Sequence, residues 1–138
     1  MEISAHIRNA PGSHSLCVST AGRTQFLPVS GKPEGRGSPV NGGELLMAAL
    51  ATCYCNDLYR EAERLGIGIS ACEVTAMARF DGVGLAATSI TYAARVESQA
   101  SAEEVERLLS ETDRLAEVHN TLRAGCPVER VAWHPSAA

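Results

Sequence analysis

The stretch that decides the fold is Asn41-Gly-Gly-Glu-Leu-Leu-Met-Ala-Ala-Leu-Ala-Thr-Cys-Tyr-Cys-Asn-Asp57. Its opening asparagine is a good N-cap residue, and Glu44 places a negative charge in the first turn, so the stretch predicts the start of a helix. The helix should continue to about Leu65, before a glycine stop. Its first half is apolar nearly all round and should be buried on most sides. Two thiols, Cys53 and Cys55, lie near its middle.

The size and charge of the chain exclude several classes of protein. It has 138 residues and a net charge of -4, with basic residues scattered rather than clustered. The length fits one domain. Without a basic patch, neither nucleic acid nor an anionic membrane is an expected partner. The longest apolar run, Leu45 to Cys55, is shorter than the roughly 20 residues that a membrane-spanning helix needs.

The first residues do not resemble a signal peptide, because Met1-Glu-Ile-Ser-Ala-His6 has neither a basic start nor a hydrophobic stretch. We therefore expect a cytoplasmic protein whose cysteines are mostly reduced. The five cysteines are odd in number and form no C-x-x-C pair. Neither a disulfide scaffold nor a zinc ribbon is expected.

The other elements follow from alternation of apolar residues and from turn chemistry. Strands are predicted over residues 3–8, 15–20, 24–29, 71–80, 85–97 and 128–133. A loop rich in Gly and Pro, residues 31–40, precedes the long helix. Ser101 and Glu104 form a capping box that opens a second helix, which extends to Ala124 or breaks near Val118. The order predicts a single α+β domain.

Three segments carry a resemblance to a known family: Asn41-Gly-Gly-Glu-Leu-Leu46, Ala48-Ala-Leu-Ala-Thr-Cys53 and His119-Asn-Thr-Leu122. With the order of elements, they resemble OsmC and the organic hydroperoxide resistance proteins over essentially the whole chain. The resemblance implies an OsmC-like α+β fold in which two chains intertwine as a homodimer. Each long helix would be held between sheets, with the active sites at the dimer interface.

The resemblance also implies a mechanism. In that family one cysteine attacks the peroxide oxygen as a thiolate and becomes a sulfenic acid, and a second cysteine condenses with it. The attacking cysteine corresponds to Cys53, and the second one to position 116, where this chain has Ala116. A glutamate and an arginine help to ionise the first thiol. The glutamate corresponds to Glu44, and three residues are candidates for the arginine: Arg8, Arg23 and Arg36.

Each thiol also has a purely structural explanation. Free cysteines are often buried and inert, so Cys53 is either the reactive thiol or a small core residue. Cys55 points to nearly the opposite side of the helix, so we expect it to face a sheet rather than to form a disulfide with Cys53. Cys126 is the remaining candidate for a resolving thiol, and otherwise has no role. Cys17 and Cys72 lie in predicted strands and carry no motif.

Two polar residues complete the candidate site. Asp57 lies four residues after Cys53 on the same helix face, where its charge would raise the pKa of the thiol unless an arginine intervenes. His119 replaces the family's usual serine. It could activate Cys53 as a base, bind a soft metal such as zinc with Cys53, Cys55 and Asp57, or serve as a polar interface residue.

These patterns favour thiol-dependent reduction of organic hydroperoxides through Cys53, with a thiol reductant as partner and no cofactor. The sulfenic acid would be reduced by an external thiol or by Cys126. Two alternatives stay open. One is a non-catalytic protein that holds a small apolar ligand in the interface cleft. The other is a metal-binding protein that uses Cys53, Cys55 and His119.

Overall fold

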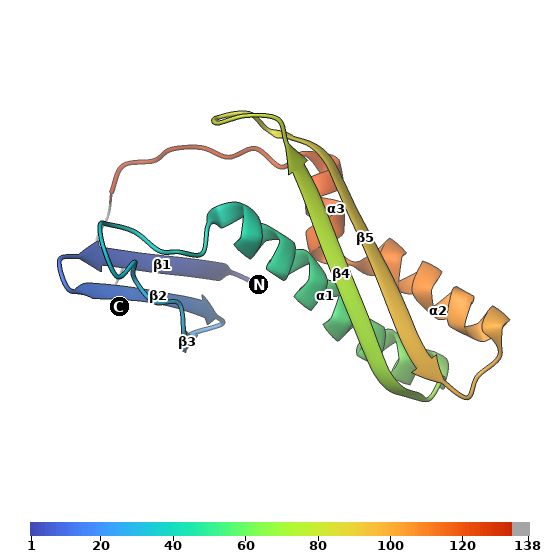
Figure 1. Ribbon diagram of the computed structural model, residues 1–138. Coiled ribbons are helices and arrows are strands. Elements are labelled where there is room, and N and C mark those ends of the chain that lie inside the picture. The colour runs from blue at the N-terminus through green and yellow to red at the C-terminus, as the bar shows by residue number, and fades with distance from the viewer. Residues whose placement is uncertain (134–138) are drawn as a thin grey trace. The chain divides into compact units, whose positions relative to one another are not determined.

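A computed structural model describes residues 1–133 of the chain. Its elements, in chain order, are β1 (Ile3–Ala10), β2 (Ser13–Thr20), β3 (Arg23–Leu27), α1 (Gly42–Leu65), β4 (Ile69–Phe80), β5 (Ala87–Ser98), α2 (Ala102–Leu115) and α3 (Glu117–Ala124) (Figure 1). The mixed α+β class predicted from the sequence is confirmed. The described chain forms two compact units, residues 1–46 and 47–133, and α1 begins in the first and continues into the second.

The first unit is a three-stranded antiparallel sheet in the order β1-β2-β3. Its register pairs Arg8 with Ser15, and Arg23 with Thr20. Because side chains alternate between faces along a strand, these pairs place Arg8 and Arg23 on opposite faces of the sheet. β3 ends at Leu27, two residues earlier than predicted, because the following proline has no N–H to donate to a ladder.

The start of α1 is fixed by reciprocal hydrogen bonds between Asn41 and Glu44. The backbone N–H of Glu44 donates to Asn41 Oδ1 at 2.9 Å, and the N–H of Asn41 donates to Glu44 Oε2 at 2.7 Å. This pair satisfies two N–H groups that a helix start leaves unpaired. At the other end Gly66 has a φ of +69°, a conformation that glycine adopts readily. The predicted bounds of α1 are confirmed.

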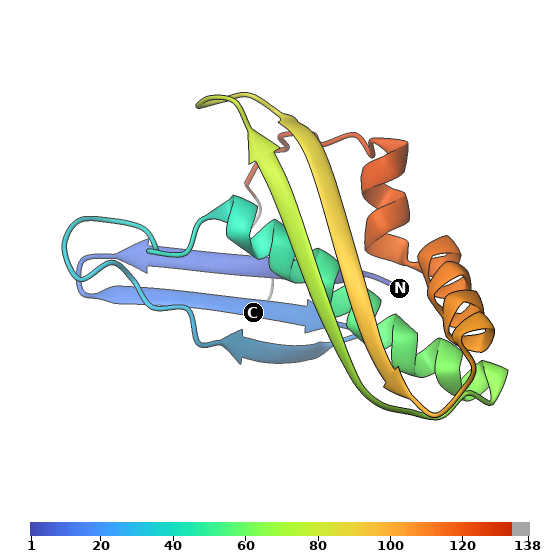
Figure 2. The ribbon, with the colours of Figure 1, turned by 45° about the vertical axis from the view of Figure 1, so that its right-hand side comes forward.

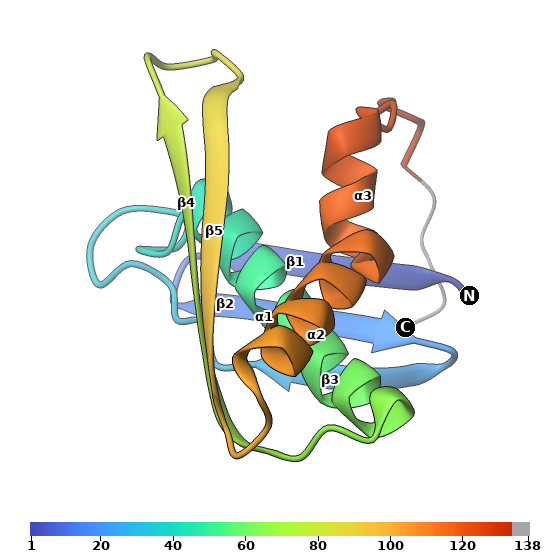
Figure 3. The ribbon, with the colours of Figure 1, turned by 90° about the vertical axis from the view of Figure 1, so that its right-hand side faces the viewer.

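The second unit packs helices against one face of a long β-hairpin. β4 and β5 pair in antiparallel register from Ile69–Ser98 to Phe80–Ala87. The hairpin runs obliquely across α1 (Figure 2), and edge-on it has α1 and α2 on the same side (Figure 3). The opposite face is polar at its centre, where Arg95 and Glu73 form an exposed ion pair at 2.9 Å.

The core of this unit forms around one stripe of α1. Tyr54, Leu58 and Ala62 recur every four residues and are at most 3% exposed. They pack with Leu108 of α2 and with Ala116. Partly buried residues of the hairpin close the cluster, namely Ile69, Cys72, Val74, Tyr92, Ala94 and Val96. The rotation of α1 about its axis is therefore set by this stripe.

Ala116 separates the last two helices. The predicted capping box is present, with Ser101 and Glu104 bonded to each other as the first turn of α2 requires. Ala116 leaves the helical conformation, with φ -68° and ψ 106°, and is fully buried. The break predicted near Val118 therefore occurs two residues earlier, and α3 follows as a separate helix.

Three sequence expectations differ from the structure. The strand predicted over residues 128–133 is wrong, because these residues form no ladder and the β4–β5 sheet is two-stranded in the described chain. An alternating pattern permits a strand, but pairing also requires the edge of another strand within hydrogen-bonding reach, which the pattern does not report. β5 begins at Ala87 rather than at Leu85. The first half of α1 is less buried than expected, since Ala48, Ala49 and Thr52 are exposed.

Within residues 1–133, no helix is both long enough and apolar enough to cross a membrane. This agrees with the short apolar run in the sequence.

We expect the substitution Leu58→Ala to lower the free energy of unfolding by about 2–5 kcal/mol, because it removes a fully buried side chain from the α1 stripe. The control is Val128→Ala, which truncates an apolar side chain that is 98% exposed and should change stability by less than about 0.5 kcal/mol. Urea denaturation followed by circular dichroism measures both. Equal effects would mean that the stripe does not organise the core.

Candidate active site

The thiol of Cys53 lies between two carboxylates. Its Sγ donates a hydrogen bond to Asp57 Oδ2 at 3.4 Å, within the same helix. Glu117 Oε2 lies 4.0 Å from the same sulfur and comes from the start of α3. Asp57 is 4% exposed, whereas Cys53 is half-buried and reachable from solvent. The helical face of Cys53 is thus joined to a segment more than sixty residues away in sequence.

One arginine lies beside both carboxylates. Nη1 of Arg60 lies 2.8 Å from Asp57 Oδ1 and 3.6 Å from Glu117 Oε1. The guanidinium side chain is about half exposed, so its charge is held at the rim of the cluster rather than inside it. This arrangement pairs the nearly buried Asp57 with a cation, as a charge removed from water requires.

Burial is the largest influence on the Cys53 thiol and raises its pKa. The backbone N–H of Val118, at the start of α3, acts in the opposite direction, and Asp57 and Glu117 raise the pKa further. Burial also raises the pKa of Asp57, against the lowering effects of Cys53 and Arg60. In this arrangement the resting cysteine is a protonated thiol whose proton points at a carboxylate of increased basicity.

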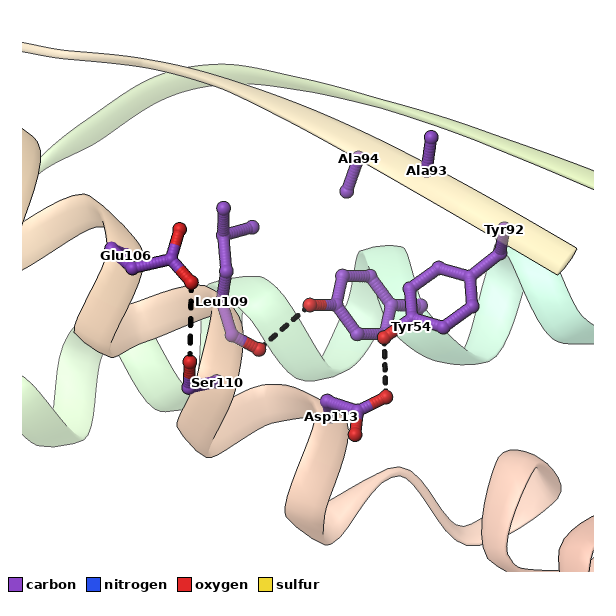
Figure 4. A pocket seen from close by; sticks show the side chains of 8 residues that line it. All are labelled: Tyr54, Tyr92, Ala93, Ala94, Glu106, Leu109, Ser110 and Asp113. Carbon is purple, nitrogen blue, oxygen red and sulfur yellow. Dashed lines mark hydrogen bonds between the residues drawn. The ribbon is translucent and has the colours of Figure 1, made fainter.

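A shallow groove of about 420 Å³ lies on another side of α1. Figure 4 shows the residues that line it, which are Tyr54, Tyr92, Ala93, Ala94, Glu106, Leu109, Ser110 and Asp113. The hydroxyl of Tyr54 donates to the carbonyl oxygen of Leu109 at 2.8 Å, and that of Tyr92 donates to Asp113. Cys53 is not among the lining residues, so the groove and the thiol are separate features.

His119 is buried against the two tyrosines. Its ring centroid lies 4.6 Å from that of Tyr92, edge to face, and 5.5 Å from that of Tyr54. Burial lowers its pKa, and Arg123 adds to this effect. Neither ring nitrogen has a hydrogen-bond partner among the described residues. His119 is therefore a neutral ring at pH 7, held by aromatic contacts.

A family model described as OsmC-like protein matches residues 35–130. The matched segment contains α1, the β4–β5 hairpin, α2 and α3, and with them Cys53, Asp57, Arg60 and Glu117. The chain belongs to the OsmC-like family. No curated protein sequence matches it.

Solved structures share the OsmC-like fold at low sequence identity. An OsmC-like protein from Mycoplasma pneumoniae has a TM-score of 0.60 and 19% identity, covering 88% of this chain and 86% of that one. An organic hydroperoxide resistance protein from Legionella pneumophila has a TM-score of 0.58 and 15% identity, covering 89% and 90%. Another, from Elizabethkingia anophelis with thiocyanate bound, has a TM-score of 0.60 and 16% identity, covering 89% of each chain.

In this OsmC-like protein the segment around Ala116 adjoins Cys53. Glu117 lies beside the sulfur, and the N–H of Val118 lowers the pKa of the thiol. Position 116, where the family resemblance puts the second cysteine, is therefore within the same neighbourhood. Ala116 itself is fully buried and supplies only a methyl group to the core.

The residues that correspond to the family's glutamate and arginine lie in the first unit. Glu44 is engaged in capping α1. The sheet register separates Arg8 from Arg23, and Arg36 lies in the loop before α1. In residues 1–133 the cation joined to the Cys53 cluster is Arg60. The roles of Glu44, Arg8, Arg23 and Arg36 stay predictions.

The structure also shows the positions of Cys55 and Cys126. Cys55 faces β4, as expected from its helical position, and its Sγ lies 3.3 Å from that of Cys72. Cys126 is exposed just beyond α3, with its sulfur 3.8 Å from the carbonyl oxygen of Pro127. Its role as a resolving thiol stays a prediction.

Metal-ligating side chains gather in one place within the described chain. Cys53, Asp57 and Glu117 have ligand atoms within 4.8 Å of one another. Cys55 and His119, the other ligands considered from the sequence, are not in this group. The positive charge of Arg60 beside the two carboxylates weakens their attraction for a cation.

Sequence reasoning missed Arg60 and Glu117. A signal existed for Arg60, because Cys53, Asp57 and Arg60 recur at i, i+4 and i+7 along one helix face. No local signal existed for Glu117, which reaches the site only through the break at Ala116.

We expect Asp57→Asn to lower the pKa of the Cys53 thiol, because it removes a negative charge and leaves Arg60 free to approach the sulfur. In the native protein alkylation should increase only above the ordinary thiol pKa of about 8.5, and in the variant the profile should shift to lower pH. The measurement is the rate of Cys53 alkylation by iodoacetamide between pH 6 and 10, read by peptide mass spectrometry. Glu63→Gln, an exposed charge change on α1, is the control. An unchanged profile would contradict the assignment of Asp57.

Proposed function

We propose that this protein reduces organic hydroperoxides through Cys53. The observation that carries the proposal is the setting of the thiol, which combines a proton acceptor, a cation and the start of a helix. Two structures that share the fold are named organic hydroperoxide resistance proteins, from Legionella pneumophila and Elizabethkingia anophelis. Membership of the OsmC-like family and the half-buried position of Cys53 support the same chemistry.

The proposed reaction begins with transfer of the thiol proton from Cys53 to Asp57. The thiolate attacks the terminal oxygen of the hydroperoxide, forming an S–O bond as the O–O bond breaks. The departing alkoxide takes up the proton held by Asp57 and leaves as an alcohol, while Cys53 becomes a sulfenic acid. The N–H of Val118 favours the thiolate during this sequence, and the guanidinium of Arg60 is paired with Asp57.

The sulfenic acid is then reduced by an external thiol. Ala116 has no thiol to condense with it, and Cys126 is an exposed thiol beyond α3 whose resolving role stays a prediction. A first thiol displaces water to give a mixed disulfide, and a second thiol releases Cys53 as its thiol. The protein thus needs a thiol reductant as its second substrate.

We propose also that the protein works as a homodimer. Apolar side chains are exposed along the tip of the β4–β5 hairpin, namely Met77, Phe80, Val83, Leu85 and Ile90. Exposed small residues of α1 add a surface that another chain could approach closely. Grouped apolar exposure of this kind is typical of protein interfaces. An intertwined second copy of this chain would cover both.

A second candidate function is binding of a small apolar molecule without turnover. The raised pKa of Cys53 favours it, because a protonated thiol is a poor nucleophile at pH 7. The groove offers the half-buried ring of Tyr92 as a contact for such a molecule. Native mass spectrometry that finds a retained apolar ligand, together with thiols inert to hydroperoxide, would establish this function instead.

We expect Cys53→Ser to remove most of the consumption of cumene hydroperoxide in the presence of dithiothreitol. Cys17→Ser, a half-buried thiol of β2, should retain native turnover and is the matched control. Asp57→Asn should consume hydroperoxide more slowly although its thiol is alkylated faster, since it cannot return a proton to the alkoxide. Full turnover by Cys53→Ser would exclude the proposal. If Asp57→Asn accelerated both alkylation and hydroperoxide consumption, only the proposed proton transfer would be excluded, and the role of Cys53 would stand.

We expect sedimentation equilibrium to give twice the chain mass of 14.6 kDa. Phe80→Asp should shift the equilibrium toward the monomer, because it places a charge in the exposed apolar tip. The control is Ala102→Asp, which adds the same charge at an exposed position of α2. A monomer at every concentration would refute the dimer.

A further inference from the structure

A second pair of thiols lies apart from the cluster at Cys53. Cys55 of α1 and Cys72 of β4 have their sulfur atoms 3.3 Å apart, and both side chains are half-buried. We propose that Cys55 and Cys72 are a second redox centre, a dithiol that a hydroperoxide converts to a disulfide fastening α1 to β4. The proposal does not depend on turnover at Cys53.

The geometry requires little movement. A disulfide has a sulfur–sulfur distance of about 2.05 Å, so the two atoms must approach by roughly 1.3 Å, within reach of small side-chain rotations. The backbones that carry them are held by the core, because Tyr54 and Leu58 flank Cys55 on α1 and Val74 follows Cys72 on β4. The packing of α1 against β4 therefore holds the two sulfurs near each other.

Helical periodicity separates the Cys55–Cys72 pair from Cys53. Residues two apart point to different sides, so Cys53 meets the carboxylates while Cys55 meets the hairpin. Tyr59, one turn after Cys55, lies close enough to Cys72 for that thiol to raise the pKa of the phenol. This half-exposed hydroxyl can donate a hydrogen bond to a Cys72 thiolate.

The oxidation balances with one hydroperoxide. The thiolate of one cysteine attacks the terminal peroxide oxygen, the O–O bond breaks, and protonation releases an alcohol. The second sulfur then attacks the sulfenic sulfur, an S–S bond forms, and water leaves. Two electrons pass from the pair to the hydroperoxide. An external dithiol such as dithiothreitol restores both thiols by exchange.

The bond would act on stability as well as on redox state. Its closed loop runs from residue 55 to residue 72, through the end of α1 and the start of β4. Such a loop restricts the unfolded chain, and we expect the oxidised form to melt about 5–15 °C above the reduced form. The pair would then strengthen the second unit under the conditions in which hydroperoxides accumulate.

The test uses the full chain carrying Cys53→Ser. Trypsin leaves residues 53 and 55 in one peptide, because no lysine or arginine lies between Arg36 and Arg60, so the substitution removes an ambiguity of mapping. The reduced variant is treated with cumene hydroperoxide, alkylated, digested and analysed by mass spectrometry. We expect the peptide with Cys55 to be linked to the peptide with Cys72, the link to be cleaved by dithiothreitol, and the melting temperature to rise.

Further variants keep the outcome decisive. Cys72→Ser should lose the link and the melting shift while it retains hydroperoxide consumption by Cys53. Cys126→Ser should keep both the link and the melting shift. Alkylation of both thiols after oxidation, or a link to Cys17 or Cys126 instead, would overturn the proposal. Failure of turnover at Cys53 would leave the linked peptide intact, so the two proposals fail separately.

Discussion

Burial of the Tyr54, Leu58 and Ala62 stripe is the constraint on which the rest of the second unit depends. These side chains pack against the hairpin and α2, and they fix the rotation of α1 about its axis. This rotation also fixes which elements the neighbouring residues of α1 face. Cys53 must lie beside the start of α3, and Cys55 must lie beside β4. Two thiols two residues apart thereby acquire different chemistry.

The surroundings of Cys53 combine opposing electrostatic effects. Burial and two carboxylates oppose ionisation of the thiol, whereas the backbone at Val118 favours it and Arg60 offsets part of the negative charge of the carboxylates. The balance keeps the thiol protonated at rest, which protects it from indiscriminate oxidation. It also places an acceptor for the proton within hydrogen-bonding distance. In the proposed reaction the thiol therefore reacts by passing its proton to Asp57, rather than by standing as a free thiolate.

Packing defines the surroundings of His119. Its ring is enclosed by Tyr54 and Tyr92, with both nitrogens unpartnered among the described residues, and its role as a base or a ligand stays a prediction. Its lowered pKa keeps it uncharged, so its burial costs less than that of an imidazolium. Asp113 is meanwhile engaged by Tyr92 and Arg123. The aromatic cluster thus joins α1, the hairpin and α3 as a structural unit.

The sequence by itself determined the local elements and the family. The Asn41–Glu44 cap, the capping box at Ser101 and the glycine after α1 are short-range signals, so α1, α2 and the hairpin were predicted closely. Three short segments and the order of the elements sufficed to identify the OsmC-like family. The strand expected over residues 128–133 failed because strand formation depends on a partner edge that no local pattern reports. Only the tertiary structure decided which groups meet. Glu117 reaches Cys53, and Cys72 reaches Cys55, because packing of the α1 stripe brings together segments distant in sequence, and helical or strand periodicity carries no information about such pairs.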